Sequence, residues 1–126
     1  IPLGWQSSSI GKEYINENIG SYQTYGNYRG DEDEAQQYVE DAYDNLCSEN
    51  YSKAAGLSQK AIRILRRTTD DDNIGMLQDA EWYNALANLS RGQLHYVLKA
   101  KRDLNKIARG NGKHKDEAKE LLNKLE

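Results

Sequence analysis

The sequence predicts an all-α fold of antiparallel helix-pair repeats: two repeats, a C-terminal capping helix and an N-terminal segment that is irregular or helical. Apolar residues recur at the i, i+3, i+4 and i+7 spacing that places them on one face of a helix. Short polar turns separate successive helical stretches, which makes neighbouring helices antiparallel. The pattern also repeats at a constant offset, since Ala42 corresponds to Ala85 and Tyr51 to Leu94. Equal offsets in both helices of a pair indicate an internal repeat.

The composition is consistent with one domain of this type. The chain has 126 residues, of which 37% are hydrophobic and 29% are charged. Helix pairs bury narrow apolar stripes, so this hydrophobic content is sufficient, and the charged residues cover the outer faces. The single Pro agrees with a mostly helical chain, and no apolar run is long enough to span a membrane. We therefore expect no direct membrane insertion of this fragment.

Residues 1–30 are expected to form an N-terminal extension that packs on the repeats. Within it, residues 1–9 are expected to be irregular, with Trp5 docked on the body, and residues 11–25 to form a short helix. The tyrosines clustered in this extension are Tyr14, Tyr22, Tyr25 and Tyr28. Two interpretations stay open: the cluster covers the first helix pair, or it forms an exposed aromatic surface for a ligand or protein.

The repeat domain is predicted over residues 31–126, and its first repeat over about residues 33–67. The apolar stripe of the first helix consists of Val39, Ala42, Tyr43, Leu46 and Cys47. After a polar turn at residues 48–50, the stripe of the second helix consists of Tyr51, Ala54, Leu57, Ser58, Ala61, Ile62 and Leu65. Acidic residues at the start of the first helix interact favourably with the positive end of its dipole and with its unpaired N–H groups. Cys47 is interpreted as a small buried hydrophobic residue.

The second repeat is predicted over about residues 76–109, and the capping helix over about residues 115–126. The two stripes of this repeat are Trp82, Ala85, Leu86 and Leu89, then Leu94, Val97, Leu98, Ala100, Leu104 and Ile107. Gly92 lies between them and suits a left-handed helix cap, because it has no Cβ. The capping helix places Ala118, Leu121, Leu122 and Leu125 on one face. That face is expected to cover the last pair of the array.

These residues resemble the tetratricopeptide repeat family, in which a helix pair recurs about every 34 residues. The positions that match or nearly match its pattern of small and aromatic residues are Ala42, Tyr51, Ala54, Ala61, Trp82, Ala85, Gly92 and Ala100. The chain departs from the pattern at Val97, where the family usually has Ala, and no Pro ends either repeat. Residues 82–125 also resemble degenerate repeats in membrane-anchored or exported proteins of Bacteroidetes-type bacteria.

The second resemblance implies an exported or periplasmic protein. The chain begins at Ile1, and its only Met is Met76. We therefore expect a processed or truncated piece, and a removed signal peptide or anchor fits the resemblance.

Charge is distributed unevenly along the chain. Residues 1–63 hold 5 basic and 10 acidic side chains, whereas residues 64–126 hold 12 basic and 10 acidic ones. This distribution suits head-to-tail contacts or charged peptide partners, and the alternative is solvated outer helix faces. The C-terminal bases that could neutralise phosphates are Lys99, Lys101, Arg102, Lys106, Arg109, Lys113 and Lys115. Because the acidic first repeat would repel a polyanion, we expect no nucleic-acid partner.

No motif for catalysis, a cofactor or a metal is present in the sequence. His95 and His114 lie at no metal-ligand spacing, and a single Cys does not provide a zinc site. The acidic runs at residues 31–34 and 70–72 lack the loop pattern of a calcium site. Nucleotide-binding loops and Ser-His-acid arrangements are also missing. We therefore expect that the protein is not an enzyme and holds no cofactor or metal.

The resulting hypothesis is a protein-interaction scaffold that binds a peptide or protein on the concave face, where the first helix of each pair lies. Its candidate contact residues are Tyr43, Asp79, Trp82, Tyr83, Leu86 and Asn88. Core packing is the alternative role for each of them. The alternative function is a structural or self-assembly domain of a larger membrane-anchored protein, suggested by the opposite charges of the two halves.

Overall fold

The computed structural model describes residues 4–20, 22, 31–68 and 71–126. These ranges contain six α-helices, one short 3-10 helix and no strand, which confirms the predicted all-α class. The helices are α1 (Gly4–Asn18), α2 (Asp31–Cys47), α3 (Tyr51–Leu65), η1 (Asp71–Asn73), α4 (Ile74–Ser90), α5 (Leu94–Arg109) and α6 (Lys115–Lys124).

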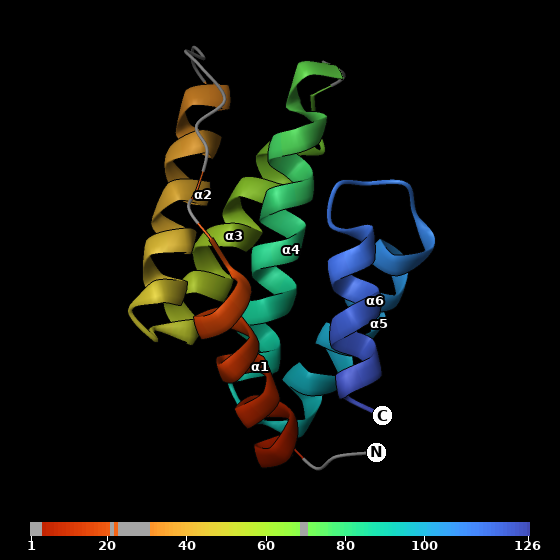
Figure 1. Cartoon of the computed structure of the whole chain (residues 1–126). Helices are drawn as coiled ribbons and strands as arrows, with labels where there is room; N and C mark the ends of the chain where they lie inside the picture. The colour runs from red at the N-terminus through yellow and green to blue at the C-terminus, as the bar shows by residue number, and fades with distance from the viewer. Residues whose placement is uncertain (1–3, 21, 23–30, 69–70) are drawn as a thin grey trace.

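Successive helices pack side by side, as the ribbon shows (Figure 1). The predicted helix pairs correspond to α2 with α3 and to α4 with α5. In addition, α3 packs closely against α4, so the two pairs form one continuous bundle, and α6 packs on α5. Together they form a bundle of stacked helix pairs that a further helix follows.

Helix α4 is the centre of the bundle, because it packs against α1, α2, α3 and α5. All residues from 82 to 90 are buried. A helix that is apolar around its whole circumference is suited to such an enclosed position. Trp82 of α4 and Leu104 of α5 are both buried, as expected for two helices that face each other across a core.

The N-terminal helix α1 differs from the sequence expectation. Residues 4–9, expected to be irregular, form its first turns, and Trp5 is 69% exposed instead of docked. The first part of the buried face of α1 is made of small residues: a Cβ on Gly11 would lie 2.8 Å from the Ser90 Oγ. The Ser8 hydroxyl also donates to the Ser90 carbonyl at 2.8 Å. The large apolar residues Tyr14 and Ile15 are buried only in the second half of α1, so the first turns carry no apolar signal that would have placed the helix start at Gly4.

Two of the four clustered tyrosines lie over the core. The ring of Tyr14 meets that of Trp82 edge-on, with 6.0 Å between centroids. The ring of Tyr22 lies 5.9 Å from that of Tyr43 and 6.3 Å from that of Tyr83. The tyrosines outside the described residues are Tyr25 and Tyr28. In the described part the tyrosines act as a cover, but α1 packs mainly on α4 and not on the first helix pair as expected.

Two apolar stripes also differ from the prediction. Cys47 is exposed, because it is the last residue of α2 and the chain turns there toward α3. Leu94 and Leu98 are 59% and 51% exposed, whereas Val97 and Leu104 are buried. The buried face of α5 is therefore rotated from the predicted one, since α4 and α6 cover the side that carries Val97 and Leu104.

Gly92 has a φ of +83°, which confirms the predicted left-handed conformation. We expect Gly92→Ala to lower the free energy of unfolding by about 1–2 kcal/mol, because a Cβ is unfavourable there. Gly56→Ala is the matched control, since Gly56 lies inside α3 and an added Cβ would meet nothing within 4 Å. That change should raise stability by about 0.5–1 kcal/mol. Urea denaturation measures both effects, and the same sign for the two variants would contradict the prediction.

Stability should also depend on Tyr14 at alkaline pH. Burial, with smaller contributions from Glu117 and Glu120, raises the pKa of the Tyr14 phenol to about 12. An unfolded tyrosine ionises near pH 10, so between about pH 10 and 12 the unfolded state loses a proton that the native state keeps. Stability therefore falls as pH rises through this window. Tyr14→Phe should remove about 2–3 kcal/mol of this alkaline loss, measured by urea denaturation at a series of pH values. An unchanged slope would show that the phenol is not responsible.

Candidate binding cleft

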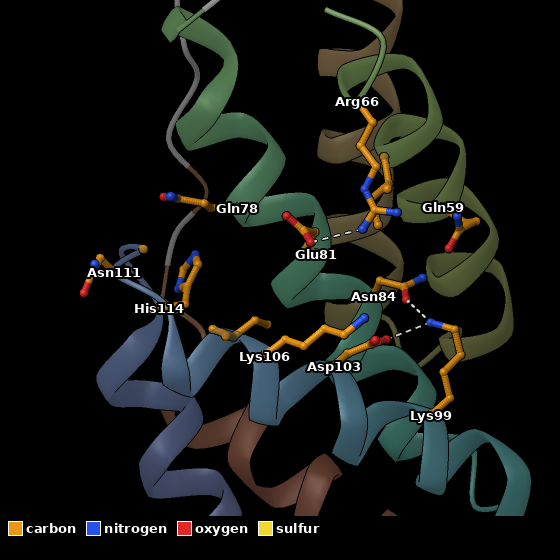
Figure 2. Close-up of a pocket in the computed structure, with 14 residues that line it drawn as sticks. Gln59, Arg66, Gln78, Glu81, Asn84, Lys99, Asp103, Lys106, Asn111 and His114 are labelled. Carbon is orange, nitrogen blue, oxygen red and sulfur yellow. Dashed lines mark hydrogen bonds and ion pairs between the residues drawn. The ribbon is translucent and has the colours of Figure 1, made fainter. Parts of the chain in front are cut away.

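A cleft of about 500 Å³ lies between α3 and α5 (Figure 2). Both helices pack against α4 but make few contacts with each other, so α4 forms the floor. The lining residues are Gln59 and Ile62 from α3 with Arg66 directly after it, Gln78, Glu81 and Asn84 from α4, and Lys99, Asp103, Lys106 and Ile107 from α5. The chain before α6, at residues 110–112 and His114, completes the lining.

Helical spacing explains why these side chains share one cleft. On α5, Lys99, Asp103 and Lys106 follow the i, i+4 and i+7 spacing of a single face. On α3, Gln59 and Arg66 are seven residues apart and also lie on one face. Each wall therefore presents a stripe of long polar side chains above the α4 floor.

Asn84 is a buried amide whose hydrogen-bonding groups all have partners. Its Nδ2 donates to the Ala55 carbonyl and to the Ser58 hydroxyl, each at 3.1 Å. Its Oδ1 accepts from the Asn88 amide and from the Lys99 ammonium, each at 3.1 Å. Because a buried amide with every partner in place has a fixed orientation, this network ties α3, α4 and α5 together beneath the cleft.

Two ion pairs line the walls. The Arg66 guanidinium lies 3.2 Å from the Glu81 carboxylate, and the Lys99 ammonium lies 2.7 Å from that of Asp103. Both pairs are partly exposed, so each contributes little to stability. Lys106 is exposed and has no ion-pair partner among the described residues, and its side chain lies along the cleft (Figure 2). An acidic group entering the cleft would therefore meet an unpaired positive charge.

Asp79 is a buried carboxylate that holds the end of the cleft together. It lies 2.7 Å from the His114 Nε2 and 2.9 Å from the Lys113 ammonium. The His114 Nδ1 lies 2.8 Å from the Glu117 carboxylate, and the ring stacks on Trp82 with 5.2 Å between centroids. Each ring nitrogen lies within hydrogen-bond distance of a carboxylate, so the cluster is an anchor for the start of α6.

The structure places most of the predicted contact residues in the interior. The buried ones are Asp79, Trp82, Tyr83, Leu86 and Asn88. Helix α1 packs on α4 and touches α2, the first helices of the two pairs, where the predicted binding surface lies (Figure 1). Tyr43 is half-buried, and its hydroxyl donates to the Gly20 carbonyl. Burial, followed by the neighbouring Cys47 thiol, raises the pKa of Tyr43. A binding role for these six residues stays a prediction.

The cleft was not predicted, because its walls look like ordinary solvated helix faces in the sequence. Gln59 and Arg66 are polar residues at a spacing that any outer face shows. His114 is three residues from Glu117, but its contact with Asp79 spans 35 residues and leaves no local pattern. One signal was available: Asn84 and Asn88 are polar residues one turn apart among the apolar and aromatic residues of the stretch 82–89. Such a pair must find buried partners.

Comparison with models of protein families, with curated proteins and with solved structures gives no match for this chain. Within the described ranges, no helix combines the length and the apolar character that crossing a bilayer requires. In the same ranges, no three His, Cys, Asp or Glu side chains are grouped so that they could hold a metal ion. The tetratricopeptide resemblance therefore rests on the sequence motifs and on the packing of helix pairs.

The anchor at Asp79 should dominate the stability of this region. Asp79→Ala leaves the half-buried His114 and the Lys113 ammonium without their shared acceptor, so we expect a loss of about 3 kcal/mol. Asp103→Ala is the matched control, because it removes the partly exposed partner of Lys99 and should cost less than about 1 kcal/mol. Urea denaturation compares the two variants. Equal losses would contradict the structural importance given to Asp79.

Proposed function

We propose that the chain is a non-enzymatic protein-interaction scaffold of the tetratricopeptide-like type, and that it binds an extended peptide segment in the cleft between α3 and α5. The main support is that this cleft is open while α1 covers the concave face of the helix pairs. The proposal therefore moves the binding surface from the concave face to the cleft. A non-enzymatic role is favoured because both nitrogens of His114, the only histidine at the cleft, are engaged.

The cleft offers the contacts that a peptide backbone needs. The side-chain amides of Gln59, Gln78 and Asn111 can donate to peptide carbonyls and accept from peptide N–H groups. Ile62 and Ile107 add apolar contacts between these polar groups. A volume of about 500 Å³ lies within the range of pockets that enclose a ligand of drug size, which corresponds to a few peptide residues.

The charges of the cleft favour a peptide with an acidic side chain. Lys106 supplies a positive charge that has no ion-pair partner in the described part of the chain. Glu81 and Asp103 line the same cleft and would repel a polyanion such as nucleic acid. A segment with one acidic residue among polar or apolar neighbours meets both conditions.

A second candidate function is a structural or self-assembly role within a larger membrane-anchored protein. Trp5, Leu94 and Leu98 are each more than half exposed. The start of α1 lies against the turn before α5, where a Cβ on Gly4 would lie 2.5 Å from the Gly92 carbonyl oxygen. The three apolar side chains thus belong to one end of the bundle, and burying them between two copies would favour association. The membrane anchor, the Bacteroidetes-type origin and an exported or periplasmic location rest on the sequence resemblance alone.

Selection from a random peptide library tests the cleft. We expect enriched peptides to carry Asp or Glu and to bind the wild type in fluorescence polarisation. Lys106→Glu should weaken binding at least about tenfold, because it replaces the unpaired cation by a repelling charge. Lys124→Glu is the matched control: it makes the same charge change at an exposed site of α6 outside the cleft and should leave the affinity within about twofold.

The competing outcomes of this experiment are distinct. Equal losses in both lysine variants would indicate a net-charge effect and contradict the cleft. Binding that resists Lys106→Glu but is lost in Tyr43→Ser would favour the concave face. Light scattering on the unliganded protein reports self-association separately, through a mass that rises with concentration.

A further inference from the structure

One side of α5 is exposed and does not belong to the cleft. Its residues follow the spacing i, i+4, i+7, i+8, i+11 and i+15, which places them on a single side of the helix. They are Leu94, Leu98, Lys101, Arg102, Asn105 and Arg109. None of them is buried, and none lines the cleft between α3 and α5. We call this set the basic face, because its charged members are all cations.

The outer side of α2 repeats this spacing with the opposite charge. Its residues are Asp33, Gln37, Glu40, Asp41, Asp44 and Ser48, and none of them is buried. This set, the acidic face, lies about half a turn from the buried residues Val39 and Ala42, so it points away from the bundle. Helix α2 contains seven acidic residues and no basic one, so its negative charge is not offset on the helix itself.

The charges of both faces are available to a partner. Within the described ranges, no ion pair includes a charged group of either face. The Asp41 carboxylate accepts a hydrogen bond from the Gln37 amide at 3.0 Å, and the Arg109 Nε donates to the Asn105 carbonyl at 3.3 Å. These contacts stay within one helix and neutralise no charge. Each face therefore keeps its charge for an oppositely charged surface.

The two faces are complementary when they lie antiparallel. The pairs are then Asp33 with Arg109, Gln37 with Asn105, Glu40 with Arg102, Asp41 with Lys101, Asp44 with Leu98 and Ser48 with Leu94. Three of these pairs are ionic and one joins two amides. A parallel arrangement would place Asp33 opposite Leu94 and Arg109 opposite Ser48, so only two ionic pairs would remain. Opposite charges across a helix contact determine partner and orientation, so the antiparallel arrangement is favoured.

A groove between α5 and α6 adjoins the basic face. It has a volume of about 440 Å³, and Lys101 and Asn105 of the basic face line it together with Lys119 and Leu122 of α6. The acidic residue in its lining is Glu126, so cations are in excess. A helix that lies on the basic face would also cover this groove, and Lys119 would add a further cation to the contact.

We propose that the basic face binds the acidic face of a second copy of this chain, with α5 and α2 antiparallel. Figure 1 shows α2 at one side of the bundle and α5 with α6 at the other. One copy therefore cannot use both faces on the same partner, and the copies associate head to tail. This inference rests on self-assembly, the second candidate function above, and specifies its interface. It is independent of peptide binding in the cleft, which uses other residues.

Sedimentation velocity of the whole chain over a range of concentrations tests the association. A contact between single helices is small, so we expect weak and salt-sensitive association. The mass should rise with concentration at 10 mM salt, where the Debye length is about 30 Å, and equal one chain at 1 M salt, where it is about 3 Å. A mass of one chain at every concentration in low salt would overturn the proposal.

Charge reversal identifies the two faces. One variant combines Glu40→Lys with Asp41→Lys, and the other combines Lys101→Glu with Arg102→Glu. None of the four residues is buried, so the fold should be kept, which circular dichroism checks. Each variant alone should associate at least about tenfold more weakly than the wild type. An equimolar mixture should regain association, because each reversed face meets its reversed complement and each unchanged face meets an unchanged one.

The control variant combines Lys53→Glu with Arg63→Glu, two exposed residues of α3 outside both faces. It makes the same charge change as the α5 variant and should associate within about twofold of the wild type. A mixture that stays monomeric would contradict the pairing of the two faces. Association that persists in both reversed variants and at 1 M salt would retain self-assembly through the exposed apolar residues and overturn the contact between α2 and α5.

The single cysteine reports the register. Cys47 is exposed at the end of α2, next to Ser48, so the antiparallel arrangement places it near Leu94 of the next copy. Under mild oxidation with copper–phenanthroline, Leu94→Cys should give a ladder of disulfide-linked dimers, trimers and larger species. Asn105→Cys is the matched control, because it lies 11 residues further along the same face, and it should cross-link at least about tenfold more slowly. A faster ladder from Asn105→Cys would overturn the antiparallel register.

Discussion

The enclosure of α4 on all sides is the constraint on which the rest of the structure depends. A polar group on an enclosed helix cannot reach water, so it must find a partner within the protein. Asp79 finds its partners in the chain before α6, and Asn84 finds them in α3 and α5. Each of these buried polar groups is therefore satisfied only when a particular neighbouring segment packs beside it. Apolar packing drives the bundle together, and these hydrogen bonds determine which helix lies at which position around α4.

The cleft follows from the same arrangement. Helices α3 and α5 are both held by α4 and by the amide of Asn84, but little holds them to each other, so a space remains between their outer faces. Its floor is rigid because the Asn84 network is complete. Its walls carry long side chains such as Arg66 and Lys106 that can change rotamer. For the proposed peptide binding, a fixed floor would limit the ordering required, and adaptable walls would fit peptides of different sequence.

The fold class was predictable because the helical spacing of large apolar residues is a strong local signal. Trp82, Leu86 and Leu104 lie in the core as that spacing indicates. The prediction failed where other physical effects decide the contact. The first turns of α1 are held by close approach at Gly11 and Ser8, and such small residues carry no apolar signal.

The site was much less predictable than the fold. Asp79 was chosen as a polar surface contact, but its partner His114 comes from a distant part of the chain, and no spacing rule connects the two. Trp82 was predicted to be an exposed contact residue on a concave surface. In the structure it is buried, and Tyr14 of α1 packs against it. The sequence indicated the pairing of helices. It also indicated an N-terminal extension packed on the repeats, but not that α1 would pack mainly on α4, because that depends on tertiary packing.

The course of α1 has a consequence for how the molecule unfolds. In arrays of helix pairs each unit contacts only its immediate neighbours, so the units can separate one after another. Here α1 touches α2, α4, α5 and α6, which belong to both helix pairs and to the helix after them. Detaching either helix pair therefore breaks contacts with α1. This coupling favours all-or-none unfolding of the whole chain over stepwise loss of single helix pairs.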